Sequence, residues 1–458
     1  MGLGALALGV PHPTYDDGRN LDILYHLSHG QGQELWHHGS PFFYTFWLPW
    51  YELGATYPTL VWANGLLGLL GGWLLLRQIP GLAAPWAALC FVAWAWLPVS
   101  QANLAAFTIE AGGLLWLALA LRARQRLWQG IWVACACLWN YKLALAGGVV
   151  LVWHLANHKE AWLLLKRYVY GLAIPAAALY FLYLAYAGPA FWLRPLATYA
   201  GLVSRDANPT AVNPGADLFF YARYFWHHGM APLVLAGLAC CAYYTRRKGA
   251  SAEGWLVLAY VLAAHLLPKA PRMWLPVLPL LAGYTAWWGQ PLRQPYKWAA
   301  IAALLPWGAW PLWQAYQEAS RHQADLAIAT NALQSPTSSL GTPAAWEADT
   351  LFAYGSTLPW RVGGAAMPVA TVLGLDNLPA QSHWLLLDGT SLYAGLAWPS
   401  KAWLDQRYVK LAEVHLPGTC PTLWYEHAEY RGRTYTSIAP EADSLGQAAG
   451  RALLYHTR

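Results

Sequence analysis

The sequence predicts an α-helical protein that crosses a membrane many times. Hydrophobic residues make up 57% of the 458 residues and charged residues only 11%, whereas charged residues are about a quarter of an ordinary soluble protein. The chain also contains 30 Trp and 27 Tyr, the residues that gather where apolar helices meet lipid headgroups. Because so little charge cannot cover a soluble surface of this size, we expect about 10–11 transmembrane helices.

Apolar segments long enough to cross a bilayer can be placed along the first two thirds of the chain. They lie at about residues 59–76, 83–99, 103–121, 168–188, 228–245, 254–268, 273–290 and 298–314. Residues 127–156 would make an overlong helix with Asn140 and Lys142 near its centre, where a charge costs about 3 kcal/mol. We therefore expect this region to form two short helices, a hairpin with Lys142 at its tip.

The distribution of basic residues predicts the topology. With the hairpin, the loops at Arg122–Arg126 and Arg246–Lys248 lie inside, and the inner loops hold about twice as many Lys and Arg as the outer ones. Outer loops are then expected at residues 12–58 and 188–227. The net charge of +6 is scattered rather than gathered in a long basic run, which argues against a nucleic-acid partner.

The composition changes towards the C-terminus. Charges return, and short β-like runs occur at Thr350–Gly355, Trp384–Asp388 and Tyr408–Val414 between Gly and Pro residues. We expect residues 1–315 to form the membrane module and residues 316–458 a small soluble α/β domain outside the membrane. Five of the six Cys lie in apolar stretches, so no disulfide framework is predicted.

Two adjacent carboxylates follow the first apolar segment, in the sequence Asp16-Asp17-Gly18-Arg19-Asn20. Such a pair at a membrane interface can bind a cation, act as a base, or simply be solvated, and the residues alone leave these alternatives open. The apolar start, Met1–Pro11, is about half as long as a spanning helix. Either the first helix is shortened or the start is misplaced.

Other charged residues lie at the ends of predicted spans. They occur in Thr108-Ile109-Glu110-Ala111, in Trp139-Asn140-Tyr141-Lys142, and in the Pro-rich stretch from Pro268 to Pro279, which contains Lys269 and Arg272. Each has an ordinary explanation as well, because charges commonly mark the ends of spans and long side chains can snorkel to the interface. The pairs His37-His38 and His227-His228 are weak metal candidates, since adjacent His rarely share one ion.

The order and sidedness of these motifs resemble the membrane-embedded GT-C glycosyltransferases, in particular the branch of protein O-mannosyltransferases, aminoarabinose transferases and related enzymes of the dolichyl-phosphate-mannose mannosyltransferase type. Those proteins carry an Asp-Glu-x-Arg-Tyr type motif after their first helix. Here Asp17 stands for the usual Glu and Asn20 for the usual Tyr, so Asp16 matches the catalytic Asp. Glu110 resembles the second acidic position, and the resemblance covers about residues 1–315.

The resemblance implies an inverting glycosyltransferase in a bacterial inner membrane. It would move a sugar from a polyprenyl-phosphate-linked donor to a lipid, glycan or protein acceptor on the periplasmic face. Asp16, Asp17 and Glu110 are the expected catalytic residues, because a carboxylate can take the proton of an attacking hydroxyl. The expected contacts of the donor phosphate are Lys142, Lys269, Arg272 and Arg19. The resemblance identifies no particular cofactor, and participation of a divalent metal is left open.

Two other functions stay in view. A transporter or flippase of lipid-linked saccharides would share the basic contacts, but it should show repeated halves and polar residues in mid-membrane. Neither is evident in the sequence. An inactive scaffold with the same fold is favoured if the short first helix is genuine, because that helix would position Asp16.

Overall fold

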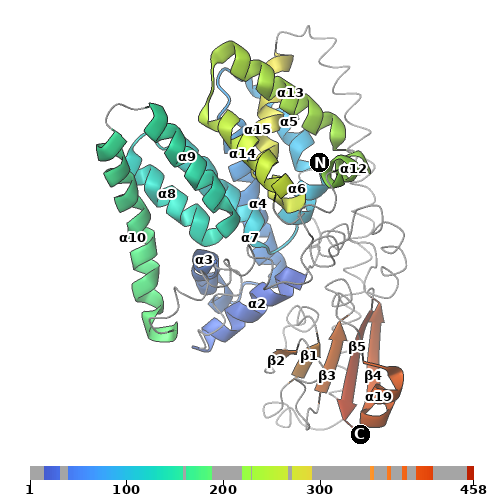
Figure 1. The fold of residues 1–458 in the computed structure, drawn as a ribbon. Coiled ribbons are helices and arrows are strands. Elements are labelled where there is room, and N and C mark those ends of the chain that lie inside the picture. The colour runs from blue at the N-terminus through green and yellow to red at the C-terminus, as the bar shows by residue number, and fades with distance from the viewer. Residues whose placement is uncertain are drawn as a thin grey trace.

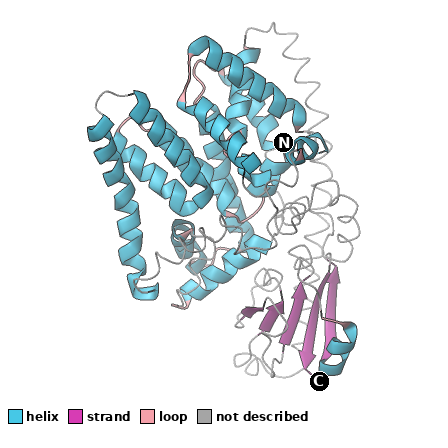
Figure 2. Cartoon of the chain, viewed as in Figure 1, coloured by secondary structure: helices cyan, strands magenta, loops and turns pink. Residues whose placement is uncertain are grey.

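In the computed structural model, the described part of the chain comprises residues 15–30, 40–157, 161–187, 219–227, 230–266, 271–290, 351–354, 369–372, 384–388, 399–415 and 451–457. The helices up to residue 290 pack into one body, and the C-terminal strands form a separate sheet with the short helix α19 (Lys401–Arg407) against it (Figure 1, Figure 2). This confirms the predicted fold class, a helical membrane-type fold with a small C-terminal α/β sheet. The predicted span at 298–314 and the domain boundary at 315 lie outside the described residues, so the number of spans stays a prediction.

The segment predicted as the first outer loop contains two helices, α2 and α3. In α3, α4, α5 and α6 a proline occupies the first turn, where its missing N–H would have no partner within the helix. The helices of this part are α2 (Tyr15–Ser28), α3 (Pro41–Glu52), α4 (Tyr57–Leu76), α5 (Ala84–Ala95), α6 (Pro98–Leu104) and α7 (Ile109–Arg122).

Helix α4 packs tightly against its neighbours through glycines. A side chain at Gly71 would collide with the backbone of Leu115 in α7, and one at Gly72 with the ring of Trp94 in α5. Small residues at such positions let helices approach closely. Among the described helices, α4 alone is long and apolar enough to cross a bilayer unaided, and α12 and α13 meet the same test as a bent pair.

The break predicted within residues 127–156 is present. Helix α8 (Arg126–Trp139) is followed by the 3-10 turn η2 (Tyr141–Leu143) and by helix α9 (Ala144–Asn157), and the two helices lie side by side (Figure 1). His154 Nε2 near the end of α9 is 2.9 Å from Arg126 Nη1 and 3.0 Å from Gln129 Nε2 at the start of α8. These contacts join the open end of a hairpin that has Lys142 at its tip, as predicted.

Four predicted spans are wrong in their bounds. Those at 103–121 and 168–188 begin instead at Ile109 and Ala161, and those at 83–99 and 273–290 are interrupted at proline. The span predicted at 83–99 ends at Ala95, and the separate helix α6 begins at Pro98. The span predicted at 273–290 begins with the 3-10 turn η4 (Pro271–Trp274), and helix α15 (Leu278–Gly289) follows after Pro276. Proline lacks the N–H that continues a helix, and its ring clashes with the preceding turn.

The remaining helices complete the body. They are α10 (Ala161–Ala187), α12 (Phe220–His227), α13 (Ala231–Lys248) and α14 (Ala252–Leu266). Helix α10 lies against α8 where Gly130 and Gly171 allow the two backbones to approach, and α13 meets α15 where Gly237 faces Leu281. One large apolar cluster contains buried residues of α4, α5, α7, α13, α14 and α15. A second cluster, rich in aromatic rings, joins α2 and α3 to the start of α4.

The C-terminal strands form one sheet in the order β2-β1-β3-β5-β4. Strand β1 pairs in parallel with β2 and β3, whereas β5 is antiparallel to β3 and β4. The elements are β1 (Leu351–Tyr354), β2 (Val369–Val372), β3 (Trp384–Asp388), α19 (Lys401–Arg407), β4 (Tyr408–His415) and β5 (Arg451–Thr457). The three predicted runs correspond to β1, β3 and β4, while β2 and β5 were missed.

Candidate functional site

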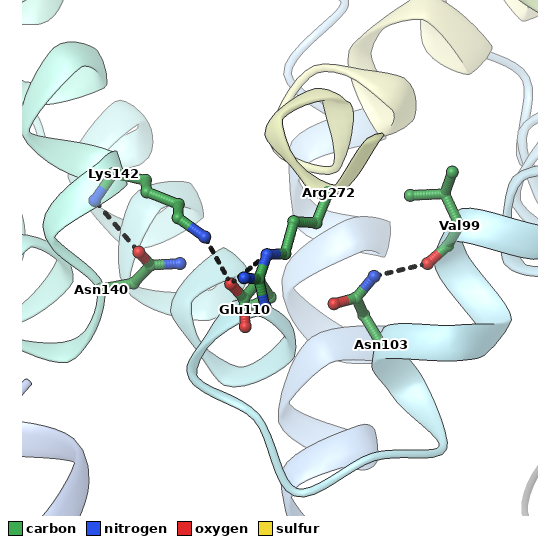
Figure 3. Close-up of polar contacts among 6 residues, drawn as sticks. All are labelled: Val99, Asn103, Glu110, Asn140, Lys142 and Arg272. Carbon is green, nitrogen blue, oxygen red and sulfur yellow. Dashed lines mark hydrogen bonds and ion pairs between the residues drawn. The ribbon is translucent and has the colours of Figure 1, made fainter. Parts of the chain in front are cut away.

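Glu110 lies in the first turn of α7 between two cations (Figure 3). Its Oε1 atom is 2.9 Å from Lys142 Nζ and 3.6 Å from Arg272 Nε. All three side chains are largely buried, with exposed fractions of 3%, 11% and 12%. The positive end of the helix dipole adds to the stabilisation of the carboxylate at this position. The structure thus brings together three of the residues that the sequence singled out.

Lys142 is presented by a turn whose backbone is fixed from two sides. The Asn140 side chain accepts a hydrogen bond from the Lys142 N–H over 3.0 Å. The buried Tyr260 hydroxyl of α14 donates to the Lys142 carbonyl over 3.0 Å. The hairpin tip is therefore tied to a helix more than a hundred residues away in the sequence.

Arg272 is presented by the turn η4, which is anchored by aromatic packing. Its neighbour Trp274 is buried, and the Trp274 ring contacts Phe225 edge to face at 4.9 Å and Tyr221 at 5.7 Å. Helix α12, which carries both rings, therefore supports the Arg272 turn. We call Glu110, Lys142 and Arg272 the Glu110 cluster. Because α7, the hairpin and η4 each contribute one of its charged groups, this cluster exists only in the folded chain.

Glu110 is presented by α7, and the segment before this helix is held by buried polar side chains. Asp17 accepts a hydrogen bond from the Phe107 N–H, and the Asn20 amide donates to the Phe107 carbonyl over 2.8 Å. Asn64 of α4 donates to the Thr108 carbonyl over 2.8 Å. Asp17 also accepts a bond from a tyrosine hydroxyl, that of Tyr57, over 2.9 Å.

The other predicted residues divide between the described and undescribed parts. Asp16 and Arg19 lie in the first turns of α2, the helix that carries Asp17. Asp17 is fully buried at the junction of α2, α4 and the Phe107 segment. Lys269, His37, His38 and His228 lie outside the described residues. Within the described residues, no group of three His, Cys, Asp or Glu side chains is arranged to hold a metal ion.

Several residues that build this region were missed at the sequence level. Asn64 had a signal, since a single amide in an otherwise apolar helix demands a hydrogen-bond partner. Asn20 was noted only as a departure from the motif. Tyr57 and Tyr260 had no signal, because the sequence contains 27 Tyr and most belong to the aromatic content expected of a membrane protein.

Helices α7 and α14 show that the basic loops lie at one end of the helical body and the Glu110 cluster at the other. Helix α7 has Glu110 in its first turn and Arg122 at its last position, and its 14 residues span roughly 21 Å. Helix α14 runs back towards Arg272 from the basic end of α13, Arg246–Lys248. The acidic and basic residues of the cluster therefore lie at the helix ends opposite to the predicted inner loops.

Comparison with known proteins gives the class to which this architecture corresponds. No protein-family model and no curated protein matches the sequence. At the level of structure, the chain shares the fold of ArnT, a protein of the GT-C group that its motifs resemble.

ArnT is an aminoarabinose transferase, and the protein compared is that of Cupriavidus metallidurans. Its crystal structure bound to undecaprenyl phosphate matches with a TM-score of 0.61 and 15% identity, over 90% of this chain and 94% of that one. The structure of ArnT in the apo state matches with a TM-score of 0.54 and 16% identity over the same shares. At this identity the likeness establishes the fold alone.

Proposed function

We propose that the protein is an inverting glycosyltransferase that takes its sugar from a polyprenyl-phosphate-linked donor and passes it to an acceptor at the outer face of the membrane. The observation that carries this proposal is the convergence of Lys142 and Arg272 on Glu110 at one end of the helical body. Two cations in a poorly hydrated position bind an oxyanion far more strongly than they would in water.

The donor class is supported by the charge and the setting of this cluster. A polyprenyl phosphate offers an oxyanion at the membrane surface and an apolar chain that stays in the lipid. ArnT, whose fold this chain shares, was crystallised with undecaprenyl phosphate. Lys142 and Arg272 are the residues of this chain that we assign to the phosphate, and Glu110 holds the two cations at a fixed separation. Lys269 and Arg19 are further candidates for the same contact.

The reaction needs a base as well as cations. In the proposed step the acceptor hydroxyl attacks the anomeric carbon, the new carbon–oxygen bond forms, and the bond to the phosphate oxygen breaks. The hydroxyl proton passes to the Asp16 carboxylate, and the polyprenyl phosphate leaves with the electron pair next to Lys142 and Arg272. A single displacement of this kind inverts the anomeric configuration.

The proposed function is tested by release of the lipid phosphate. Purified protein is given candidate polyprenyl-phosphate sugars with a membrane extract as acceptor, and free polyprenyl phosphate is measured. We expect release that depends on the acceptor and falls sharply in Lys142→Met. Lys166→Met is the matched control, because Lys142 Nζ and Lys166 Nζ each lie over a tyrosine ring, at 5.7 and 5.8 Å, but Lys166 is exposed on α10.

Two results would count against the proposal. Intact donor that crosses a vesicle membrane without release of lipid phosphate would indicate a transporter. Failure of every donor, with protein that still binds polyprenyl phosphate, would indicate a scaffold that keeps the fold and has lost the chemistry.

A further inference from the structure

The backbone of Ala106–Thr108, the Phe107 segment between α6 and α7, is hydrogen-bonded to side chains from two other helices. Asn64 of α4 donates to the carbonyls of Ala106 and Thr108, over 3.4 and 2.8 Å. Between these, Asp17 accepts from the Phe107 N–H, and Asn20 donates to the Phe107 carbonyl. Both polar groups of the Phe107 backbone are therefore bound by α2, a helix about ninety positions earlier in the chain.

The Asp17 and Asn20 side chains are themselves held in place by burial and by further hydrogen bonds. Asp17 and Asn20 are 0% and 1% exposed. Tyr57 donates to Asp17 over 2.9 Å, and Tyr44 of α3 donates to Asn20 over 2.8 Å. A buried network in which the members orient one another resists displacement, because breaking any bond leaves a desolvated polar group.

The ring of Phe107 is held as firmly as its backbone. It is fully buried and lies against Phe43 and Trp47 of α3, with ring centroids at 5.0 and 5.8 Å. Phe107 therefore joins α2 and α3 to the segment that begins α7. Glu110 follows three residues later, in the first turn of that helix, so a shift at Phe107 moves the start of α7.

We propose that Asp17 and Asn20 are positioning residues that lock α2 to the Glu110 cluster through Phe107. This rests on the proposed function, in which Asp16 of α2 receives the proton and the cations around Glu110 receive the phosphate. Asp17 is the direct neighbour of Asp16, so the bonds to Phe107 fix the base relative to the phosphate contacts. Misplacement by about 1 Å can cost on the order of a hundredfold in rate.

The first test separates the rate from donor binding. Asn20→Leu removes both hydrogen bonds of Asn20 and keeps its approximate volume. We expect kcat to fall about 10- to 100-fold, while KM for the polyprenyl-phosphate donor stays within about threefold, because Lys142 and Arg272 are untouched. Asp17→Asn keeps an acceptor oxygen for Phe107 and should lose much less activity than Asp17→Leu.

The matched control is Gln129→Leu. Gln129 is also a buried amide that donates to a backbone carbonyl of α7, that of Ala120 at the opposite end of the helix, over 3.2 Å. This variant loses the bond to α7 together with the contacts of Gln129 with Arg126 and His154, but it leaves Phe107 unchanged. We expect its kcat to stay within about threefold of the parent. An equal fall of kcat in Gln129→Leu and Asn20→Leu would overturn the positioning role.

A second measurement does not depend on activity. Amide hydrogen exchange over residues 105–110 should accelerate roughly tenfold in Asn20→Leu and stay unchanged in Gln129→Leu. Unchanged exchange in Asn20→Leu, or a donor KM that rises as much as kcat falls, would refute the proposal. A parent protein that transfers no sugar would refute the proposed function instead, and the exchange data would still decide whether α2 holds the Phe107 segment.

Discussion

Lys142 Nζ lies 2.9 Å from Glu110 Oε1, although the two residues are 32 positions apart and belong to different elements. Glu110 belongs to the first turn of α7 and Lys142 to the turn between α8 and α9. Both side chains are largely buried. Removing one partner of such a pair leaves the other charge poorly solvated, which is more costly than losing both.

This relationship predicts a coupling between the two residues. Glu110→Gln and Lys142→Met should each lower the free energy of unfolding. The loss in the double variant should be smaller than the sum of the two single losses by about 1–3 kcal/mol. The measurement is denaturant unfolding in detergent for the four proteins of the cycle. A cycle between Glu110→Gln and the exposed Lys166→Met serves as the control, and equal coupling in the two cycles would contradict the prediction.

The two cations should act on the donor. A hydrogen bond to a charged group contributes on the order of 1.5–3 kcal/mol, so Lys142→Met and Arg272→Met should each weaken donor use roughly 10- to 100-fold and acceptor use much less. Lipid donor is titrated at saturating acceptor, and then the reverse. Arg247→Met is the control for Arg272, since Arg247 lies over the Tyr243 ring at the other end of the helices. Unchanged donor dependence in folded protein would return Lys142 and Arg272 to the role of topology markers.

The two adjacent carboxylates should differ in their effects. Asp16→Asn should abolish transfer while the protein stays folded, because loss of a general base costs about 100- to 10,000-fold. Asp17→Asn should have a milder effect, since an amide oxygen can still accept from the Phe107 N–H and the Tyr57 hydroxyl. Single-turnover transfer rates compare the two. Transfer by Asp16→Asn within threefold of the parent would remove Asp16 from the mechanism.

Tyr260 should support Lys142 from a distance. Tyr260→Phe removes the bond to the Lys142 carbonyl, which contributes about 1 kcal/mol, and should reduce donor affinity by up to about tenfold. Tyr168→Phe is the control, because the buried Tyr168 hydroxyl donates to the Gly147 carbonyl of α9 over 3.2 Å without touching the turn. Equilibrium binding of polyprenyl phosphate distinguishes them, and equal affinities of the two variants would show that the Tyr260 bond is only structural.

The topology is tested by labelling in intact cells. In a variant whose native cysteines are replaced, Lys248→Cys should be protected from an impermeant thiol reagent, because the basic end of α13 is predicted to be cytoplasmic. Leu53→Cys, at the exposed turn between α3 and α4, should be labelled. Labelling of Lys248→Cys in intact cells would invert the topology and place the Glu110 cluster on the inner side.

The class of fold follows from the amino-acid sequence without further information. Low charge and long apolar segments require a membrane-type helical body, and these are properties of composition that no particular packing can change. The break at Asn140 and Lys142 was also determined locally, because a charge in the middle of a span costs more than ending the helix does. The breaks at Pro98 and Pro276 had an equally local cause but were overlooked, because hydropathy measured over a long window averages across a single proline.

Which charged residues meet depends on the packing of the folded chain. Glu110, Lys142 and Arg272 each stood at the end of a predicted span, where a charge has an ordinary explanation, and nothing in their spacing joined them. Their meeting depends on how α7, the hairpin and η4 pack, which is set by glycine contacts and by aromatic rings such as those of Phe225 and Trp274. The same holds for Asn20 and Phe107. A hydrogen bond between residues about ninety positions apart leaves no periodic signal in a sequence, because its energy depends on distance in space and not along the chain.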